Sequence, residues 1–111
     1  MMSDTTPEIA VDRLAREQAG GATVVDVREP GEYVAGHVPG TTLIPMGQLS
    51  SRLAELDRSR PVYLVCASGN RSAAMTDLLR AAGYDAYSVA GGTSAWARSG
   101  RPVETGAPRP S

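Results

Sequence analysis

The sequence predicts an α/β domain built on a small, mostly parallel five-stranded sheet flanked by helices. Short apolar segments rich in β-branched residues alternate with segments of helical periodicity, and Gly, Pro and Asn separate them. This alternation is typical of parallel strands joined by right-handed helical crossovers. With 111 residues, the chain is long enough for one hydrophobic core and too short for two.

Capping and turn residues set the expected boundaries in the first half of the chain. Asp12 is a suitable N-cap for a helix that ends at Gly20. The β-branched run of residues 23–27 is typical of a strand buried on both faces of a parallel sheet. Gly36 closes a short helix, and Pro45 stops the strand that follows. The expected elements are strands at residues 8–11, 23–27 and 41–44 and helices at residues 12–20 and 29–35.

The second half is expected to continue this alternation. Leucines recur at helical spacing over residues 47–56, and Gly83 is placed to follow a longer helix as its left-handed residue. Tyr63 on a strand and Trp96 on the last short helix are expected to serve packing. The expected elements are helices at residues 47–56, 71–82 and 93–98 and strands at residues 62–65 and 86–89.

These elements place one folded domain at residues 8–100. Residues 1–7 form a polar leader that we expect to be flexible. Residues 101–111 are rich in Pro, Gly and small polar residues, and we expect them to form a flexible tail.

The composition argues against several classes of function. The chain has 11 basic and 12 acidic side chains and a net charge of −1, so it offers no strong field to nucleic acid or to anionic lipid. No apolar run approaches the roughly 20 residues that cross a bilayer, and no secretory signal is recognisable. We therefore expect a cytoplasmic protein that binds neither nucleic acid nor membrane.

The chain contains one cysteine, Cys66, which excludes a disulfide within the chain. With His37 as the one histidine, a structural transition-metal site is not expected. Cys66 comes directly after an apolar strand, at the edge where open α/β sheets bind ligands. The loop that follows it leads into a helix and consists of Ala67, Ser68, Gly69, Asn70 and Arg71.

This loop has the features that activate a cysteine. Its backbone amides can converge on the sulfur, and the positive end of the next helix favours the thiolate, so the thiol pKa can fall from ~8.5 to roughly 3.5–7.5. Gly69 lets the backbone close without a Cβ clash, and Arg71 can face an anionic substrate or hold the loop shut. The competing interpretation is an inert, buried Cys66, the usual state of a free cysteine. The strand, cysteine, small-residue loop and helix together favour a reactive one.

The length of the loop separates two chemistries. Cysteine phosphatases have five residues between Cys and Arg, so that the amides encircle a phosphate. Only four residues separate Cys66 from Arg71. This narrower loop favours one additional sulfur atom over a tetrahedral oxyanion, which makes phosphatase or arsenate chemistry the weaker hypothesis.

Several segments together resemble the rhodanese homology domain, in particular its single-domain sulfurtransferases. The matching segments are residues 25–29, 32–33, 36–40, 44–45, 66–71, 83–84 and 91–92, with Trp96. They span most of the chain between residues 8 and 101. The family fold is a small parallel sheet with flanking helices, which agrees with the fold class inferred above.

The resemblance implies a two-step sulfur transfer without metal or organic cofactor. Cys66 would take a sulfane sulfur from thiosulfate or a persulfide donor, and a thiophilic acceptor such as cyanide or a thiol would remove it. The amides of residues 67–71 would cradle the persulfide, and Arg71 would assist anion binding. The acceptor could also be a sulfur-accepting protein. The alternative function is a rhodanese-like sulfur-carrier or regulatory binding module with little free turnover.

Asp26 and Arg28 follow a strand end and are expected near the Cys66 loop in supporting roles. Asp26 is expected to brace loop amides. Arg28 either faces an anionic donor or forms an ion pair with Glu29 or Glu32. His37 could activate the thiol, but the favoured interpretation is that it anchors the turn that follows it.

Ala67 departs from the family pattern, because many relatives carry a larger, often charged residue there. We expect a more open mouth to the site, with one fewer cation for the sulfonate end of thiosulfate. The resemblance therefore implies modest affinity for thiosulfate and leaves room for a persulfide donor.

Overall fold

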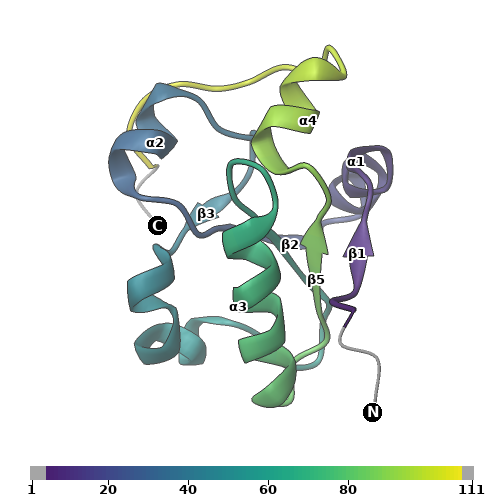
Figure 1. Cartoon of the computed structure of the whole chain (residues 1–111), viewed down its shortest axis with the longest axis vertical. Coiled ribbons are helices and arrows are strands. Elements are labelled where there is room, and N and C mark those ends of the chain that lie inside the picture. The colour runs from purple at the N-terminus through teal and green to yellow at the C-terminus, as the bar shows by residue number, and fades with distance from the viewer. Residues whose placement is uncertain (1–4, 109–111) are drawn as a thin grey trace.

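Five parallel strands lie at the centre of the computed structural model, which describes residues 5–108 (Figure 1). The strands are β1 (Glu8–Ile9), β2 (Thr23–Asp26), β3 (Thr42–Leu43), β4 (Val62–Val65) and β5 (Ala86–Val89). The helices are α1 (Val11–Ala19), α2 (Pro30–Ala35), α3 (Asn70–Ala81), α4 (Gly92–Arg98) and the 3-10 helix η1 (Met46–Glu55). The strand order is β1-β5-β4-β2-β3, and each neighbouring pair is parallel. The expected α/β fold with a five-stranded sheet is therefore confirmed.

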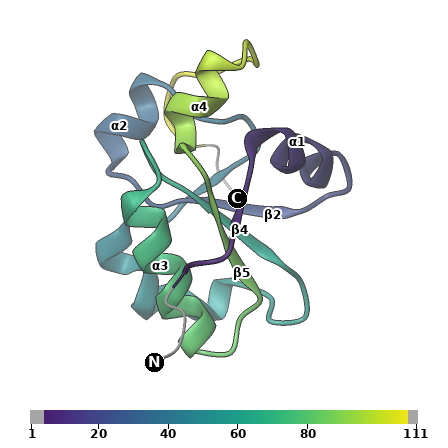
Figure 2. The same cartoon turned by 45° about the vertical axis from the view of Figure 1, so that its right-hand side comes forward.

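Helices cover both faces of this sheet. The helices α3 and η1 lie on one face and α1 and α4 on the other (Figures 1 and 2). Along β4, Leu64 belongs to a hydrophobic cluster with Leu49 of η1 and Leu79 of α3. Tyr63 belongs to the opposite cluster, which also contains Trp96 of α4. Because β4 is buried on both faces, its run of four residues is apolar without interruption.

Helix α1 begins earlier than the sequence indicated. Its N-cap is Ala10 rather than Asp12, and the amide of Leu14 donates to the Ala10 carbonyl oxygen at 3.0 Å. Asp12 therefore lies in the first turn, where a carboxylate is favourable to the helix dipole, and it pairs with Arg101 at 2.9 Å. The strand expected at residues 8–11 is shortened to β1 for the same reason. The other element boundaries agree to within one or two residues.

The segment expected to be a helix at residues 47–56 forms the 3-10 helix η1, with a break at Arg52 (φ −119°, ψ 19°). In a 3-10 helix, side chains three residues apart eclipse each other. The Arg52 guanidinium accordingly pairs with Glu55, three residues on, at 2.7 and 2.9 Å. Leucine spacing alone does not distinguish this geometry from an α-helix.

The tail that begins at residue 101 makes defined contacts with the domain. The backbones of His37 and Glu104 form an isolated antiparallel bridge, with N–H···O distances of 2.8 and 2.9 Å. The Trp96 indole N–H donates to the Pro102 carbonyl oxygen at 2.8 Å. Backbone hydrogen bonds of this kind do not depend on strand-forming residues, so composition did not predict them. Residues 1–4 of the expected leader and 109–111 of the expected tail lie outside the described residues.

The start of α4 anchors the loop that follows β4. The amide of Thr93 donates to the Cys66 carbonyl oxygen at 2.8 Å, and the amide of Ser94 donates to the Ala67 carbonyl oxygen at 3.0 Å. Gly92 makes this approach possible, because it has a left-handed φ of +58° and a Cβ there would overlap the Cys66 carbonyl oxygen. The loop therefore has a fixed position against the first turn of α4.

We expect Gly92→Ala to destabilise the protein by about 2–5 kcal/mol, because the added methyl group meets backbone in a conformation that L side chains disfavour. The measurement is the free energy of unfolding in urea. Gly31→Ala in α2 is the control, since nothing lies within 4 Å of the added Cβ there. Equal unfolding midpoints for Gly92→Ala and wild type would contradict the anchoring role.

Candidate active site

The sulfur of Cys66 lies inside the loop that joins β4 to α3. The amide of Gly69 donates to Sγ at an N···S distance of 3.1 Å. Gly69 adopts a left-handed φ of +110° and is the N-cap of α3, so the chain turns sharply between the sulfur and the helix. One amide of the small-residue loop, that of Gly69, therefore faces the sulfur.

A side-chain hydroxyl that the sequence did not indicate also contacts the sulfur. Ser72 Oγ lies 3.4 Å from Cys66 Sγ, and Ser72 is fully buried in the first turn of α3. A small polar residue one turn into the helix that follows a cysteine loop is the signal that could have identified it. The site therefore combines backbone amides with one buried hydroxyl.

Burial and hydrogen bonding act in opposite directions on the thiol. Burial on its own raises the pKa of the Cys66 thiol, because it disfavours the charged form. Hydrogen bonding with the Ser72 hydroxyl and hydrogen bonds from backbone amides outweigh this effect, so the pKa is lowered from its ordinary value. The amides belong to Ser72, Gly69 and Ser68. A lowered pKa increases the thiolate fraction, which is the nucleophilic form.

Cys66 is less accessible than the small Ala67 side chain led us to expect. Its exposed fraction is 1%, whereas Ala67 is half-buried. The amide of Gly69 nevertheless faces the sulfur, as a reactive cysteine requires. Contact between Sγ and a second molecule therefore requires a local opening of the residues that cover it.

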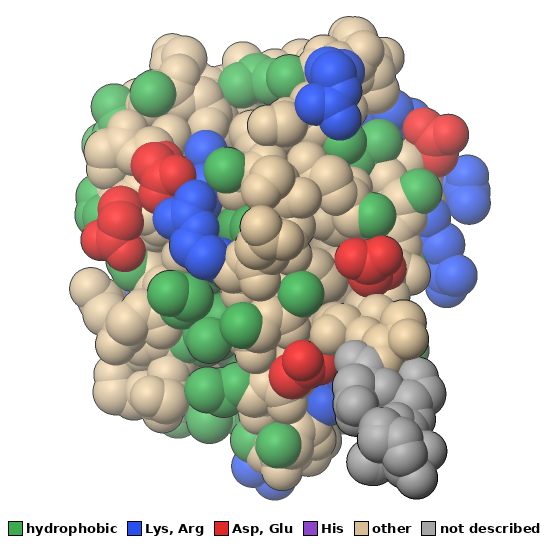
Figure 3. Space-filling view, viewed as in Figure 1, with side chains coloured by type: hydrophobic (Ala, Val, Ile, Leu, Met, Phe, Trp, Pro, Cys, Tyr) green, Lys and Arg blue, Asp and Glu red, His purple; other side chains and the backbone are tan. Residues whose placement is uncertain are grey.

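Arg71 holds the beginning of α3 to α2 rather than extending freely toward a substrate. Its guanidinium makes a bidentate ion pair with Glu32, with Nη1–Oε1 and Nη2–Oε2 distances of 2.7 and 2.8 Å. About one third of each side chain is exposed. Figure 3 shows acidic and basic side chains gathered between α2 and the upper end of α3. Of the two roles expected for Arg71, the structure favours holding the loop.

Arg28 pairs with Asp26, and not with either glutamate considered from the sequence. The pair is buried, with Arg28 Nη2 2.9 Å and Nε 3.0 Å from the carboxylate oxygens. Arg28 Nη2 also donates to the Gly36 carbonyl oxygen at 2.8 Å. Asp26 accepts from the amide of Arg28 and from no amide of the described Cys66 loop. The pair therefore fixes the connection from β2 to α2, and the loop amide that Asp26 braces is that of Arg28.

His37 is buried against α2 in the anchoring role that the sequence favoured. Its ring stacks on Tyr33 at a centroid distance of 3.6 Å, and Nδ1 lies 2.7 Å from the Tyr33 carbonyl oxygen. Because a carbonyl oxygen only accepts, Nδ1 carries the hydrogen. Nε2 lies 3.6 Å from the Glu104 carboxylate. Both ring nitrogens are therefore engaged away from Cys66.

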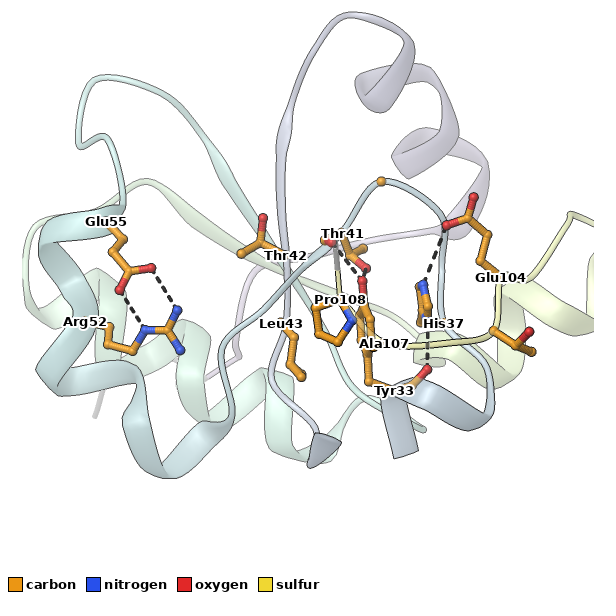
Figure 4. Close-up of a pocket in the computed structure, with 12 residues that line it drawn as sticks. Tyr33, His37, Thr41, Thr42, Leu43, Arg52, Glu55, Glu104, Ala107 and Pro108 are labelled. Atoms are coloured by element: carbon orange, nitrogen blue, oxygen red, sulfur yellow. Dashed lines mark hydrogen bonds and ion pairs between the residues drawn. The ribbon is translucent and has the colours of Figure 1, made fainter. Parts of the chain in front are cut away.

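A cleft of about 790 Å³ lies next to His37 (Figure 4). It is bounded by the segment that connects α2 to β3, by η1 and by the tail. The pair Arg52–Glu55 lies at one end and the pair His37–Glu104 at the other (Figure 4). None of its described lining residues belongs to the Cys66 loop. The cleft is therefore separate from the Cys66 sulfur.

The described residues contain neither a cluster of metal ligands nor a membrane-spanning helix. Among residues 5–108, no three or more His, Cys, Asp or Glu side chains are placed to share a metal ion. No helix in this part of the chain has the length and apolar character required to cross a bilayer.

Comparisons with known proteins agree with the fold. The sequence profile of the rhodanese-like domain matches residues 6–99. The chain is 34% identical over 105 residues to the thiosulfate sulfurtransferase GlpE of Pseudomonas aeruginosa, covering 94% of each. It is 39% identical over 108 residues to an HTH-type transcriptional regulator of Mycobacterium tuberculosis, covering 93% of this chain and 48% of the regulator, about half its length. A rhodanese-related protein from Thermoplasma volcanium has a similar structure, with a TM-score of 0.81, 35% identity and coverage of 88% and 97%.

The ion pair of Arg71 and Glu32 predicts a pH-dependent loss of stability. Hydrogen bonds from the Arg71 side chain and the Glu29 amide lower the pKa of Glu32 from 4.5 to about 2. Between these values the unfolded chain binds more protons than the folded one, so the contribution of Glu32 is complete above pH 5 and decreases toward pH 2. Since the pair is partly exposed, we expect Glu32→Gln to cost no more than about 1 kcal/mol at pH 7.

The measurement is the free energy of unfolding of wild type and Glu32→Gln from pH 7 to pH 2.5. The difference between them should diminish as the pH falls below 5. Glu8→Gln on the exposed edge strand β1 serves as the control. A wild-type advantage that stays constant down to pH 2.5 would show that the ion pair does not act as described.

Proposed function

The chain belongs to the rhodanese-like domain family, and we propose that it moves a sulfane sulfur from thiosulfate or a persulfide donor to a thiophilic acceptor through a persulfide on Cys66. The observation that carries this proposal is the position of the sulfur inside the turn, where the amide of Gly69 faces it with an N···S distance of 3.1 Å. The 34% identity with the thiosulfate sulfurtransferase GlpE over 94% of both chains supports it.

The reaction proceeds in two displacements at sulfur. The Cys66 thiolate attacks the sulfane sulfur of the donor, the donor S–S bond breaks, and the leaving group departs with the electron pair as sulfite or as a thiolate. The acceptor then attacks the terminal sulfur of the persulfide, and the electron pair of that S–S bond returns to Sγ. Each step forms one bond to sulfur and breaks another, so neither needs an oxidant, a reductant or a cofactor.

The loop residues supply hydrogen bonds rather than proton transfer in this scheme. Amides of residues 67–71 cradle the persulfide, with Gly69 already directed at Sγ. Arg71 keeps the loop against α2 through Glu32. The low exposure of Cys66 excludes bulk water and oxidants from the loaded sulfur, and a transient opening admits donor and acceptor.

The charges around the site favour a donor of low charge. Arg71 is neutralised by Glu32, and Arg28 is neutralised by Asp26. Ala67 adds no cation at the loop. Thiosulfate carries two negative charges and gains little binding energy from a site whose cations are already paired. A low-molecular-weight or protein persulfide needs no sulfonate-binding cation. We therefore propose a persulfide as the preferred donor.

A second candidate function is a sulfur-carrier or regulatory module that accepts sulfur and turns over poorly. The observation that favours it is the 39% identity with part of a transcriptional regulator. A carrier would load Cys66 but release the sulfur only to a partner protein. For either function we place the reaction in the cytoplasm, where reducing conditions keep a lone thiol from oxidising.

Incubation with a sulfur donor should add one sulfur atom to the intact protein, as measured by mass spectrometry. Cyanide should remove it and yield thiocyanate, and Cys66→Ser should never gain it. Continuous thiocyanate production over many turnovers supports the enzyme, whereas a single loading with slow release supports the carrier. Wild type that stays unmodified by thiosulfate and by a persulfide alike would contradict both functions.

Restoring a cation at the loop should improve the use of thiosulfate. We expect Ala67→Lys to raise kcat/KM for thiosulfate about fivefold, because one partly exposed charge contributes about 1 kcal/mol to an anion nearby. The gain should diminish at high salt. Ala67→Met, of similar length without charge, is the control. Equal kcat/KM values for the lysine and methionine variants would contradict the assigned effect of charge.

A further inference from the structure

Two buried serine hydroxyls extend from the reactive sulfur into the core. Ser72 Oγ lies 3.4 Å from Cys66 Sγ and 2.8 Å from Ser88 Oγ. Ser88 lies on β5 and pairs with Leu64 of β4. Leu64 precedes Cys66 by two residues. Both serines are fully buried, so water does not compete for their hydrogen bonds. No sequence motif identifies Ser88, because it meets Ser72 only through the packing of β5 against α3.

The hydrogen bonds of Ser72 can change direction with the protonation of Cys66. A hydroxyl donates one hydrogen bond and accepts two. When Cys66 is a thiol, its S–H donates to Ser72 Oγ, and Ser72 donates to the Gly69 carbonyl oxygen at 3.2 Å. When Cys66 is a thiolate, Ser72 can donate to the sulfur instead. The Gly69 carbonyl oxygen still accepts from the amide of Ala73 at 3.1 Å, so the change leaves no carbonyl unpaired.

Ser88 completes this second arrangement. Once Ser72 donates to the sulfur, its oxygen can accept from Ser88, whose hydroxyl lies 2.8 Å away. The result is a chain of donors that runs from Ser88 through Ser72 to the negatively charged sulfur. Hydrogen bonds in such a chain polarise one another, and the dry surroundings strengthen the effect.

We propose that the hydroxyl pair of Ser72 and Ser88 holds Cys66 in its anionic form, with Ser72 in contact with the sulfur and Ser88 as a positioning residue that acts through Ser72. This role rests on the proposed function in one respect. The thiolate is both the nucleophile of the loading step and the leaving group of the discharge step, and stabilising it makes it a better leaving group.

The charged groups around the loop do not account for the same effect. On α2 and α3, Glu32 and Arg71 neutralise each other. At the end of β2, Arg28 and Asp26 do the same. From β5 and the start of α4, the described residues that contact the loop and Ser72 are uncharged: Ser88, Gly92, Thr93 and Ser94. Hydroxyls and amides are therefore the groups left to stabilise the anion.

The test is the pH titration of the thiolate by its ultraviolet absorbance, taken as the difference from Cys66→Ser. Because the chain has one cysteine, the signal reports Cys66 alone, and it needs no reagent to reach the buried sulfur. We expect the midpoint to rise by about one pH unit in Ser72→Ala and by a few tenths of a unit in Ser88→Ala. The double variant should match Ser72→Ala, because Ser88 acts only through Ser72.

Thr76→Val is the matched control. Thr76 is another fully buried hydroxyl on α3, and it donates to the Ser72 carbonyl oxygen at 2.7 Å without contacting the sulfur. This variant should lower the unfolding midpoint and leave the thiol titration unchanged. If Ser88 had a merely structural role, Ser88→Ala would likewise lower the unfolding midpoint and leave the thiol titration unchanged.

Titration and sulfur transfer are separate measurements, so the two proposals can fail separately. A shifted midpoint in Ser88→Ala together with no sulfur transfer by wild type would support the hydroxyl pair and overturn the proposed function. A wild-type midpoint in Ser88→Ala would overturn the role of Ser88, whatever the turnover. Additive shifts in the double variant would overturn its action through Ser72.

Discussion

The site depends on how one loop is held between two helices. A peptide unit is planar, with its N–H and C=O on opposite sides, so fixing the carbonyl oxygens also directs the amides. The first turn of α4 fixes the carbonyl oxygens of Cys66 and Ala67. On the other side, the loop ends in the left-handed turn at Gly69, whose amide faces Sγ. A residue with a Cβ in place of Gly92 would push the loop away and lose both orientations together.

Dipoles rather than free charges stabilise the sulfur. Arg28 and Arg71 are each engaged by a carboxylate, Arg28 by Asp26 in the core and Arg71 by Glu32 at the surface. What faces Cys66 is a set of amides and the hydroxyl of Ser72, and these outweigh the effect of burial on its thiol pKa. Fixed dipoles need little reorganisation when the charge on sulfur appears and disappears, which suits the alternating roles of nucleophile and leaving group that we propose for Cys66.

Sequence patterns predicted the features that depend on residues close together in the chain. The alternation of strands and helices, and the small-residue loop after Cys66, are local features, and both are found. Contacts between distant elements were not predicted, such as the approach of Ser88 to Ser72 or the bridge between His37 and Glu104. The partner of Arg28 was difficult to predict for a different reason, because several carboxylates lie near it in the sequence. Arg28 pairs with Asp26 because both side chains are buried at the end of β2.

The most direct test is a crystal structure of the protein after exposure to a sulfur donor. The account predicts electron density for one extra sulfur bonded to Cys66 Sγ, lying inside the loop at about 3–4 Å from two or more backbone nitrogens of residues 67–71. Density for the extra sulfur outside the loop, or loop amides turned away from it, would contradict the central claim that inward-facing amides hold the transferred atom.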